Sequence, residues 1–500
     1  MKKLPDPLPG TADSDTIGSE PWTPLWIARR ALQGVVAMGI RQVLALSLNI
    51  LGSVLLARIL TPAQFGVYAI ILFIRGFLLA FGDAGLGASL IRDPQEPQEI
   101  DYRVVFTFQQ LLVFVIFIVF WIASPVVAGA YHLRREDVWL FRLVALSLLC
   151  SSLQVIPAIR MERHLAFRKL AVVEVAMAVI FNAVAVGLAW TGWGEMSFGI
   201  ALLARAFVGA LLANVLFPWR MGWSSQWRRV RCHLRFGIPY QGIAFISLLK
   251  DSIGPIYIGL FLGAAQMGYV NWASMVAVFP LTAITIFQRV YMSAFSRMQS
   301  HPEALGKFVE RAIQATNALV APAAVFILVF SSPITRLVFG EKWLVALPLF
   351  YFFWSASLFV PTFAPLMALL NALGRSQTTF FFALAWMTGT WVLGVPLIWL
   401  WGALGYAVAN LVVNFSNILL YRAIRTRVHF RALPVVGPIW AWAAALGLSG
   451  YLLEAWYHPP STLAGLVFLG VAYMIIYYGG LLARHLDEAK KLWTLILRCA

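Results

Sequence analysis

Ionisable side chains lie inside several long apolar stretches of this sequence, where charge is costly. A charged group at mid-depth of a membrane helix costs roughly 2.5–3.5 kcal/mol on insertion scales, so such residues face a protein interior or a wet cavity. Two interpretations are open. The cations line a site for an anionic group, or they pair with the carboxylates and hold helices in register. The cations are Arg41, Arg75, Arg205 and Lys250, and the carboxylates are Asp83, Glu174 and Asp251.

The balance of these charges indicates what kind of ligand a cavity would accept. Lys and Arg are at least as numerous as Asp and Glu at these positions, which favours an anionic substrate over a flat aromatic cation. Transport coupled to an ion needs a carboxylate that changes protonation or binds Na⁺, and Asp83, Glu174 and Asp251 are the candidates. Asp83 lies in the Gly-rich stretch DAGLG, so a turn or packing role is an alternative for it.

Lys250 and Asp251 are adjacent in the sequence, so their side chains point about 100° apart on a helix. We therefore expect the partners of these two residues on other helices.

The apolar stretches are long enough to cross a membrane. The chain has 500 residues, of which 61% are hydrophobic and only 12% charged, whereas about a quarter of a soluble domain is charged. A spanning helix needs about 20 apolar residues, which predicts an all-α polytopic membrane protein with about fourteen transmembrane helices. The predicted segments are 34–58, 66–91, 104–130, 138–159, 170–190, 196–217, 237–261, 266–294, 309–330, 343–371, 377–400, 403–423, 436–455 and 461–483.

The basic residues predict which loops lie in the cytoplasm. The net charge is +17, and most of the Lys and Arg between the segments fall in alternate loops. The other loops are nearly free of them, with Arg134, Arg135, Arg336 and Lys342 as exceptions. This positive-inside pattern places both termini in the cytoplasm. It also explains the charge without a nucleic-acid partner, since we identify no basic soluble domain.

A short repeat relates two hairpins of the chain. The stretch LTPAQFGVYA at 60–69 is echoed by LGAAQMGYVN at 262–271, with identical Leu, Ala, Gln and Gly residues at an offset of 202. An even number of predicted spans separates the copies, which indicates a parallel repeat about an axis along the membrane normal. The predicted organisation has a disordered cytoplasmic tail at 1–30, six-helix bundles at 31–218 and 219–432, and two extra helices with a cytoplasmic tail at 433–500.

Several stretches resemble a known family of transporters. The sequence from Ala57 to Ala69 has the form ARxLTPxxFGxYA, Asp83–Arg92 has the form DxGLGxxLIR, and Ala368–Gln377 reads ALLNALGRSQ. These stretches resemble the polysaccharide repeat-unit flippases of the Wzx type. The subgroup they resemble most exports colanic-acid- or succinoglycan-like units, within the multidrug/oligosaccharidyl-lipid/polysaccharide exporter superfamily.

The resemblance implies a function and a use for the embedded cations. Such a transporter flips an undecaprenyl-diphosphate-linked oligosaccharide by alternating access, from the cytoplasmic to the outer leaflet of the bacterial inner membrane. It serves exopolysaccharide, capsule or lipopolysaccharide biosynthesis. Arginine binds phosphate through two parallel hydrogen bonds, so Arg41, Arg75, Arg205 and Lys250 would hold the diphosphate. The expected partners are the lipid-linked substrate, membrane lipids, and a polysaccharide polymerase and chain-length regulator.

Two other functions stay open at this point. The chain would export another amphiphile, such as a drug or lipid, or it would be a membrane polymerase or ligase acting on lipid-linked sugars. The second alternative is weaker because the predicted outside loops are all short. We expect no enzyme activity, no cofactor and no metal site, since the sequence has no Gly-rich phosphate loop followed by Lys-Ser/Thr and no histidine at mid-membrane. Prolines predict kinks in several segments, at Pro239, Pro255, Pro280, Pro361 and Pro365.

Overall fold

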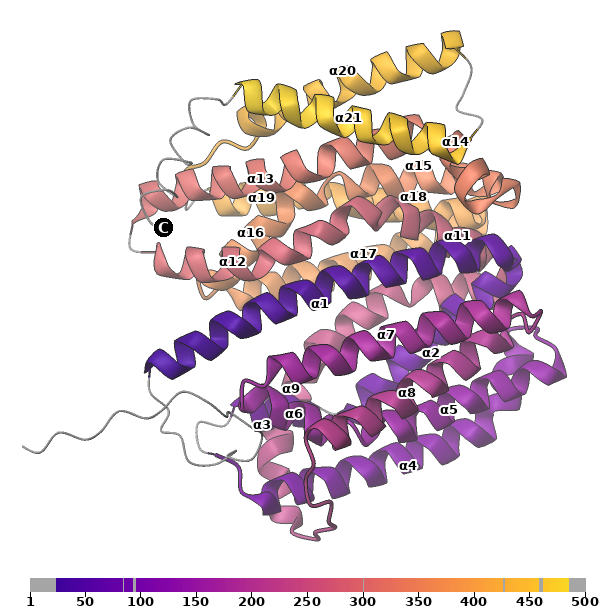
Figure 1. The fold of residues 1–500 in the computed structure, drawn as a ribbon, viewed down its shortest axis with the longest axis vertical. Helices are drawn as coiled ribbons and strands as arrows, with labels where there is room; N and C mark the ends of the chain where they lie inside the picture. Colours follow the sequence, from indigo (N-terminus) through magenta and orange to yellow (C-terminus); the bar gives the residue numbers. More distant parts are fainter. Residues whose placement is uncertain are drawn as a thin grey trace, which may run out of the picture.

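The protein is a bundle of long helices that run side by side (Figure 1). The computed structural model describes residues 24–83, 85–92, 96–299, 301–425, 428–457 and 462–484. The described residues contain helices and no strand, which confirms the all-α class. The predicted tail lies outside the described residues up to residue 23, and the first helix begins at Pro24. The proposed division into bundles stays a prediction.

The helices of the first half pack on one another, and several of their strongest contacts join helices that are far apart in the chain. The strongest packing joins α7 to α8, α1 to α7, α5 to α8 and α4 to α5. The short α3 covers one end of this group and contacts α6 and α9. The helices are α1 (Pro24–Ile59), α2 (Pro62–Asp83), α3 (Leu86–Arg92), α4 (Glu99–Ala130), α5 (Val138–Ser152), α6 (Val155–Arg163), α7 (Phe167–Trp190) and α8 (Met196–Leu216).

The second half contains more interrupted helices. Its helices are α9 (Trp227–Asp251), α10 (Gly259–Phe261), α11 (Ala264–Val278), α12 (Ile284–Arg297), α13 (Pro302–Val329), α14 (Ser331–Ile334), α15 (Leu347–Ser357), α16 (Val360–Ala372), α17 (Ser376–Trp401), α18 (Ala403–Phe415), α19 (Asn417–Arg425), α20 (Leu433–Tyr457) and α21 (Leu463–Arg484). Figure 1 shows α20 and α21 along one edge of the molecule, where both contact α13.

The breaks in these helices coincide with several of the prolines. Pro255 lies in a π turn, Gly254–Ile258, and Pro280 lies in a 3-10 turn, Phe279–Ala283. The helices on either side of Leu358 and Phe359 bend by 41° just before Pro361. Each break follows from the backbone donor that proline lacks. By contrast, α9 continues through Pro239 and α16 through Pro365.

The number of membrane crossings depends on how these breaks are counted. Within the described ranges, eleven helices are long and apolar enough to span a membrane, or twelve if the bent pair Glu341–Ser357 and Val360–Ala372 is one span. The predicted segments 237–261 and 266–294 are helical, but a π turn and a 3-10 turn interrupt them. The count of fourteen therefore stays a prediction.

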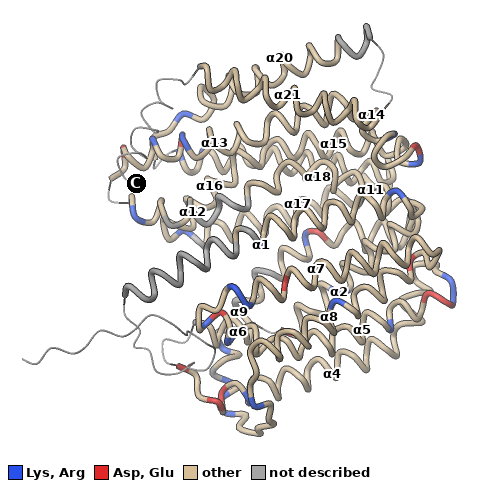
Figure 2. Tube along the Cα trace, in the orientation of Figure 1, with Lys and Arg blue, Asp and Glu red and all other residues tan. Residues whose placement is uncertain are grey.

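The charges gather at the two ends of the helices. Figure 2 shows most Lys and Arg at the end where α9 begins and where α12 and α13 meet, with fewer at the opposite end. We call the opposite end, with residues 60–62, 262–264 and 340–342, the outer end, because its loops are predicted to lie outside.

Arg134, one of the few basic residues in the loops predicted to lie outside, is neutralised at the outer end, since its Nη2 lies 2.6 Å from Glu195 Oε1. Burial alone would raise the pKa of Glu195, but hydrogen bonds from its own N–H, Arg134 and Gln64 hold that pKa below its usual value.

The two copies of the repeat meet at the outer end. The helices begin at equivalent residues, α2 at Pro62 and α11 at Ala264, and these two helices make the most extensive contact between the two halves of the chain. A Cβ atom on Gly66 would overlap the carbonyl oxygen of Ala264, and one on Gly268 would overlap that of Pro62. The repeated glycine therefore lets the two backbones touch.

Three side chains strengthen the closure of the outer end. Lys342 Nζ donates to the carbonyl oxygens of Arg58 (2.8 Å) and Leu60 (2.6 Å), which end α1. Arg58 Nη1 donates in return to Leu337 O at 2.6 Å. Trp343 donates from Nε1 to Ala57 O at 2.9 Å, and its buried ring packs against Phe65. The exceptional Lys342 thus caps a helix C-terminus, a favourable place for a cation.

We predict that Gly268→Ala separates α2 from α11. The added methyl group has no space against the Pro62 carbonyl, and overpacking of this kind costs about 1–3 kcal/mol. The apparent Tm in detergent, measured by thermal unfolding, should fall.

The matched control is Gly187→Ala in α7, where an added Cβ meets nothing within 4 Å. This change should leave the Tm unchanged or raise it, because alanine favours helix over glycine by about 1 kcal/mol. Equal Tm values for the two variants would contradict the close approach.

Candidate functional site

Two arginines of the first half lie inside the protein without a carboxylate partner. Arg75 is on α2 and Arg205 on α8, and both are half-buried. The Nε of each is buried and makes no hydrogen bond, and neither residue belongs to an ion pair of the described ranges. The two positive charges are close enough to repel each other. An anion beside them would relieve that repulsion and supply the missing acceptors.

Aromatic side chains surround this arginine pair. The Tyr68 ring stacks on Phe198 with 4.0 Å between centroids, and Tyr68 is close enough to interact electrostatically with Arg75 and Arg205. Arg205 also lies over the Phe181 ring, 5.9 Å from its centroid. Tyr68 and Arg75 are seven residues apart and so share one face of α2. Sequence reasoning missed Tyr68, although this spacing was available.

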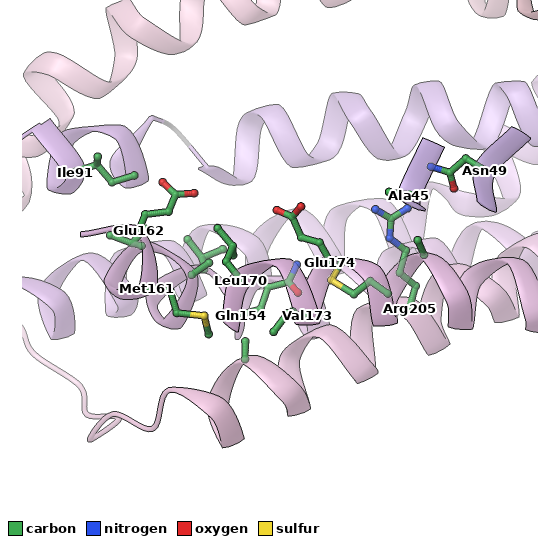
Figure 3. Close-up of a pocket in the computed structure, with 16 residues that line it drawn as sticks. Ala45, Asn49, Ile91, Gln154, Met161, Glu162, Leu170, Val173, Glu174 and Arg205 are labelled. Carbon is green, nitrogen blue, oxygen red and sulfur yellow. The ribbon is translucent and has the colours of Figure 1, made fainter. Parts of the chain in front are cut away.

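Arg205 borders a cavity of about 500 Å³. Figure 3 shows the Arg205 guanidinium group near Asn49 and the carboxylate of Glu174 on the neighbouring helix. The cavity is lined by residues of α1, α3, α6, α7 and α8, and of the turn before α6, with Asn49 and Gln154 among the polar ones. It lies within the first half of the chain and has both positive and negative lining groups.

Arg41 forms an ion pair with Glu174. This contact joins α1 to α7, which are among the most tightly packed helices. The 37% exposed Glu174 side chain also lines the cavity beside Arg205. The pairing follows the second interpretation of the embedded charges, in which a carboxylate holds helices in register. A substrate role for Arg41 and an ion-coupling role for Glu174 stay predictions.

Lys250 and Asp251 form an ion pair with each other at the C-terminus of α9. The expectation that these neighbours face apart and find partners on other helices was wrong. Both residues lie in the last turn of α9, so their Cβ atoms do point about 100° apart, but the long, flexible Lys250 side chain reaches around the helix to the Asp251 carboxylate. Both residues line a second cavity, of about 460 Å³, at the junction of α2, α9, α11, α15 and α18.

Asp83 has a local structural role. Its carboxylate accepts backbone hydrogen bonds from Gly85 and Gly87, which satisfies donors at the start of α3. Gly85 has a positive φ of 69°, and a Cβ on it would overlap the Gly237 carbonyl of α9. Asp83 and Gly85 of the DAGLG stretch therefore have a turn and packing role against α9, the alternative considered for this stretch. Within the described ranges, no group of three or more His, Cys, Asp or Glu is placed to hold a metal.

The structure gathers the predicted residues in three places and adds amides that the sequence did not single out. Arg75 and Arg205 are close together, Arg41 and Glu174 pair beside them, and Lys250 and Asp251 line the second cavity. Three amides also line that cavity, Asn271, Asn410 and Asn414. The spacing of Asn410 and Asn414 by four residues in an apolar segment was the signal that could have found them.

Comparison with known proteins identifies relatives in polysaccharide biosynthesis. The family model described as "Polysaccharide biosynthesis protein" matches residues 55–348, more than half of the chain. The succinoglycan biosynthesis transport protein ExoT of Rhizobium meliloti is 26% identical over 303 residues, 59% of each chain. The lipopolysaccharide biosynthesis protein WzxC of Escherichia coli is 24% identical over 413 residues, 79% of this chain and 80% of WzxC. The match with ExoT thus spans about three fifths of that relative.

A solved structure has the same fold. The lipid II flippase MurJ in an inward closed conformation superposes with a TM-score of 0.74 and 14% identity, and the match covers 91% of this chain and all of that one. At this identity the likeness concerns the architecture alone.

We predict that Glu174→Gln destabilises the protein by about 1–2 kcal/mol, a value reduced for the partial exposure of the pair. The change leaves Arg41 without its carboxylate and increases the uncompensated positive charge near Arg205. Adding Arg41→Gln should restore part of the loss, since it removes the stranded charge. Thermal unfolding of the single and double variants measures both effects.

The control is Glu136→Gln, an exposed carboxylate in the turn before α5. If Glu174→Gln melts like this control, the ion pair does not contribute to stability.

Proposed function

This chain belongs to the polysaccharide biosynthesis protein family, and from that premise we propose that it is a membrane transporter, not an enzyme. Its substrate is an undecaprenyl-diphosphate-linked oligosaccharide repeat unit, which it flips from the cytoplasmic to the outer leaflet. The names of ExoT, a succinoglycan biosynthesis transport protein, and of WzxC, a lipopolysaccharide biosynthesis protein, support this proposal, and the fold shared with MurJ is compatible with it.

The observation that carries the proposal is the pair of arginines without a carboxylate. Burying two like charges is unfavourable unless an anion joins them. A diphosphate has negative charge and oxygen atoms that accept hydrogen bonds. Each guanidinium group can bind a phosphate group by donating two parallel hydrogen bonds. Arg75 and Arg205 therefore form the centre of the proposed headgroup site. Arg41 and Lys250 have a smaller proposed part in phosphate binding, because each already has a carboxylate partner.

The closed outer end supports transport by alternating access. Gly66, at the contact with α11, and Arg75 lie on the same helix, and nine residues of helix span about 13 Å. A rocking motion that separates α2 from α11 at the outer end would carry Arg75 with it. The headgroup site would then become accessible from the other side of the membrane, as alternating access between two bundles requires.

The proposed location is the bacterial inner membrane, with both termini in the cytoplasm. The asymmetric distribution of Lys and Arg supports this orientation. A polysaccharide polymerase and a chain-length regulator are the proposed partners downstream, since a flipped repeat unit has to be joined to others. The carboxylates Asp83, Glu174 and Asp251 are the candidates for coupling to H⁺ or Na⁺.

We predict that deleting the gene makes a lipid-linked sugar accumulate in the cytoplasmic leaflet and lowers surface polysaccharide. Wild-type protein should reverse both changes. The double variant Arg75→Gln/Arg205→Gln should lower export at least tenfold, since each charge-assisted hydrogen bond contributes about 1.5–3 kcal/mol. Export is measured by labelling surface polysaccharide at matched protein levels.

The control is Arg142→Gln on α5, an arginine that stacks on Trp121 and Trp139 with centroid distances of 5.1 and 4.9 Å. This variant should export normally. Normal surface polysaccharide without lipid accumulation in the deletion strain would refute the function, and full export by the double variant would refute the site.

A further inference from the structure

The second cavity has a composition unlike that of the arginine site. It is about 460 Å³ in volume, within the range of roughly 300–1,000 Å³ typical of small-molecule sites. Its charged groups are Lys250 and Asp251, which neutralise each other. The remaining polar lining is uncharged: Asn271, Ser274, Ser357, Tyr406, Asn410 and Asn414. The cavity therefore offers many hydrogen bonds without an excess of positive charge.

Several of these groups have hydrogen-bonding capacity to spare. The Asn271 side chain and the Tyr406 hydroxyl make no hydrogen bond with the described part of the chain. Asn414 donates to the backbone and side-chain oxygens of Asn410, which leaves the amide donors of Asn410 free. Amides and hydroxyls that both donate and accept suit a ligand rich in hydroxyl groups. A phosphate, which only accepts, would use fewer of them.

The cavity lies where the two copies of the repeat diverge below their contact. Asn271 and Ser274 of α11 line it on one side, and the residues equivalent to them at the offset of 202, Ala69 and Leu72 of α2, line it on the other. At the same depth below the outer end, the copy of the repeat in α11 is thus polar and the copy in α2 is apolar. These residues are seven to ten positions past the helix starts, about 10–15 Å from the outer end, near mid-depth of a bilayer core of about 30 Å.

The position also relates the cavity to the arginine site. Leu72 at the cavity and Arg75 are one helical turn apart on α2, about 4.5 Å along the axis. A ligand with a diphosphate at Arg75 could place the sugar attached to it toward the cavity. Phe353 and Tyr406 provide apolar ring surface in the wall of the cavity, and such rings can pack against the apolar C–H groups on the face of a sugar ring.

We propose that this cavity is the glycan subsite of the transporter and binds a largely uncharged, hydroxyl-rich sugar of the repeat unit. The inference rests on the proposed function. Asn271 and Asn410 are its principal contacts, with Tyr406 and Ser274 beside them, and the arginine pair holds the diphosphate. Recognition of the lipid carrier and of the sugar is thereby divided between the two halves of the chain.

The test compares two lipids in binding to the purified full chain. One is the lipid-linked sugar extracted from the membranes of the deletion strain, and the other is undecaprenyl diphosphate without sugar. Asn271→Ala/Asn410→Ala should bind the sugar-bearing lipid about tenfold more weakly, since two hydrogen bonds of about 0.5–1.5 kcal/mol are lost. Binding of undecaprenyl diphosphate should not change. Arg75→Gln should weaken binding of both lipids.

Two further variants keep the test decisive. Leu72→Trp fills the cavity from the exposed α2 side without altering an amide, and it should reproduce the selective loss if the amide variant does not fold. Asn371→Ala, at an exposed amide of α16 outside the cavity, should bind both lipids normally.

The outcomes separate the two proposals. Wild-type affinity in the amide variant and in Leu72→Trp, or an equal loss for both lipids, overturns the glycan subsite while leaving the flippase proposal standing. If the wild-type protein binds neither lipid and no lipid-linked sugar accumulates in the deletion strain, the proposed function fails and the subsite fails with it.

Discussion

The backbones of α2 and α11 meet at Gly66 and Gly268, and the arrangement of the cavities depends on this contact. Helices in a membrane gain little from the hydrophobic effect when they associate, so close packing through small residues matters more. The two glycines allow the approach at the outer end, and larger residues follow on both helices. The helices are therefore closest where the outer end is closed, and the second cavity lies deeper between them.

The chemistry lies in the differences between the two halves rather than in their likeness. At equivalent depths, α2 has Ala69 and Leu72 where α11 has Asn271 and Ser274, and Arg75 has Ala277 as its counterpart. The first half thus provides the arginines without acidic partners, and the second provides a neutralised Lys250–Asp251 pair and amides. In the proposed division of the site, the repeat supplies a common frame and each copy would bind a different part of one ligand.

The sequence predicts the features that depend on local composition. The all-helical class follows from apolar length, and the repeat was visible in the sequence, but the contact of its two glycines became evident only in the structure. Pairings between helices could not be predicted in the same way, because membrane helices are apolar on most sides and their sequence does not fix their rotation. Whether Glu174 faces Arg41 or Arg205 depends on that rotation. The prediction for Lys250 and Asp251 was wrong because it considered only the direction of the Cβ atoms and not the reach of the lysine side chain. Asn271 becomes a candidate only when the fold places it in one cavity with Asn410 and Asn414 of another helix.

Within the described ranges Arg75 and Arg205 form no ion pair, and we propose that this gives the proposed headgroup site its selectivity. A carboxylate paired with either guanidinium group would stabilise the empty protein and would compete with a bound phosphate. Arg41 has such a partner in Glu174. In the proposed site, a bound anion would offset the unfavourable burial of two cations. Binding then stabilises the occupied state relative to the empty one. Arg75 shares α2 with the outer contact, so in the proposed mechanism the free energy of anion binding would act on the packing of α2 against α11 and would connect occupancy of the site to closure of the outer end.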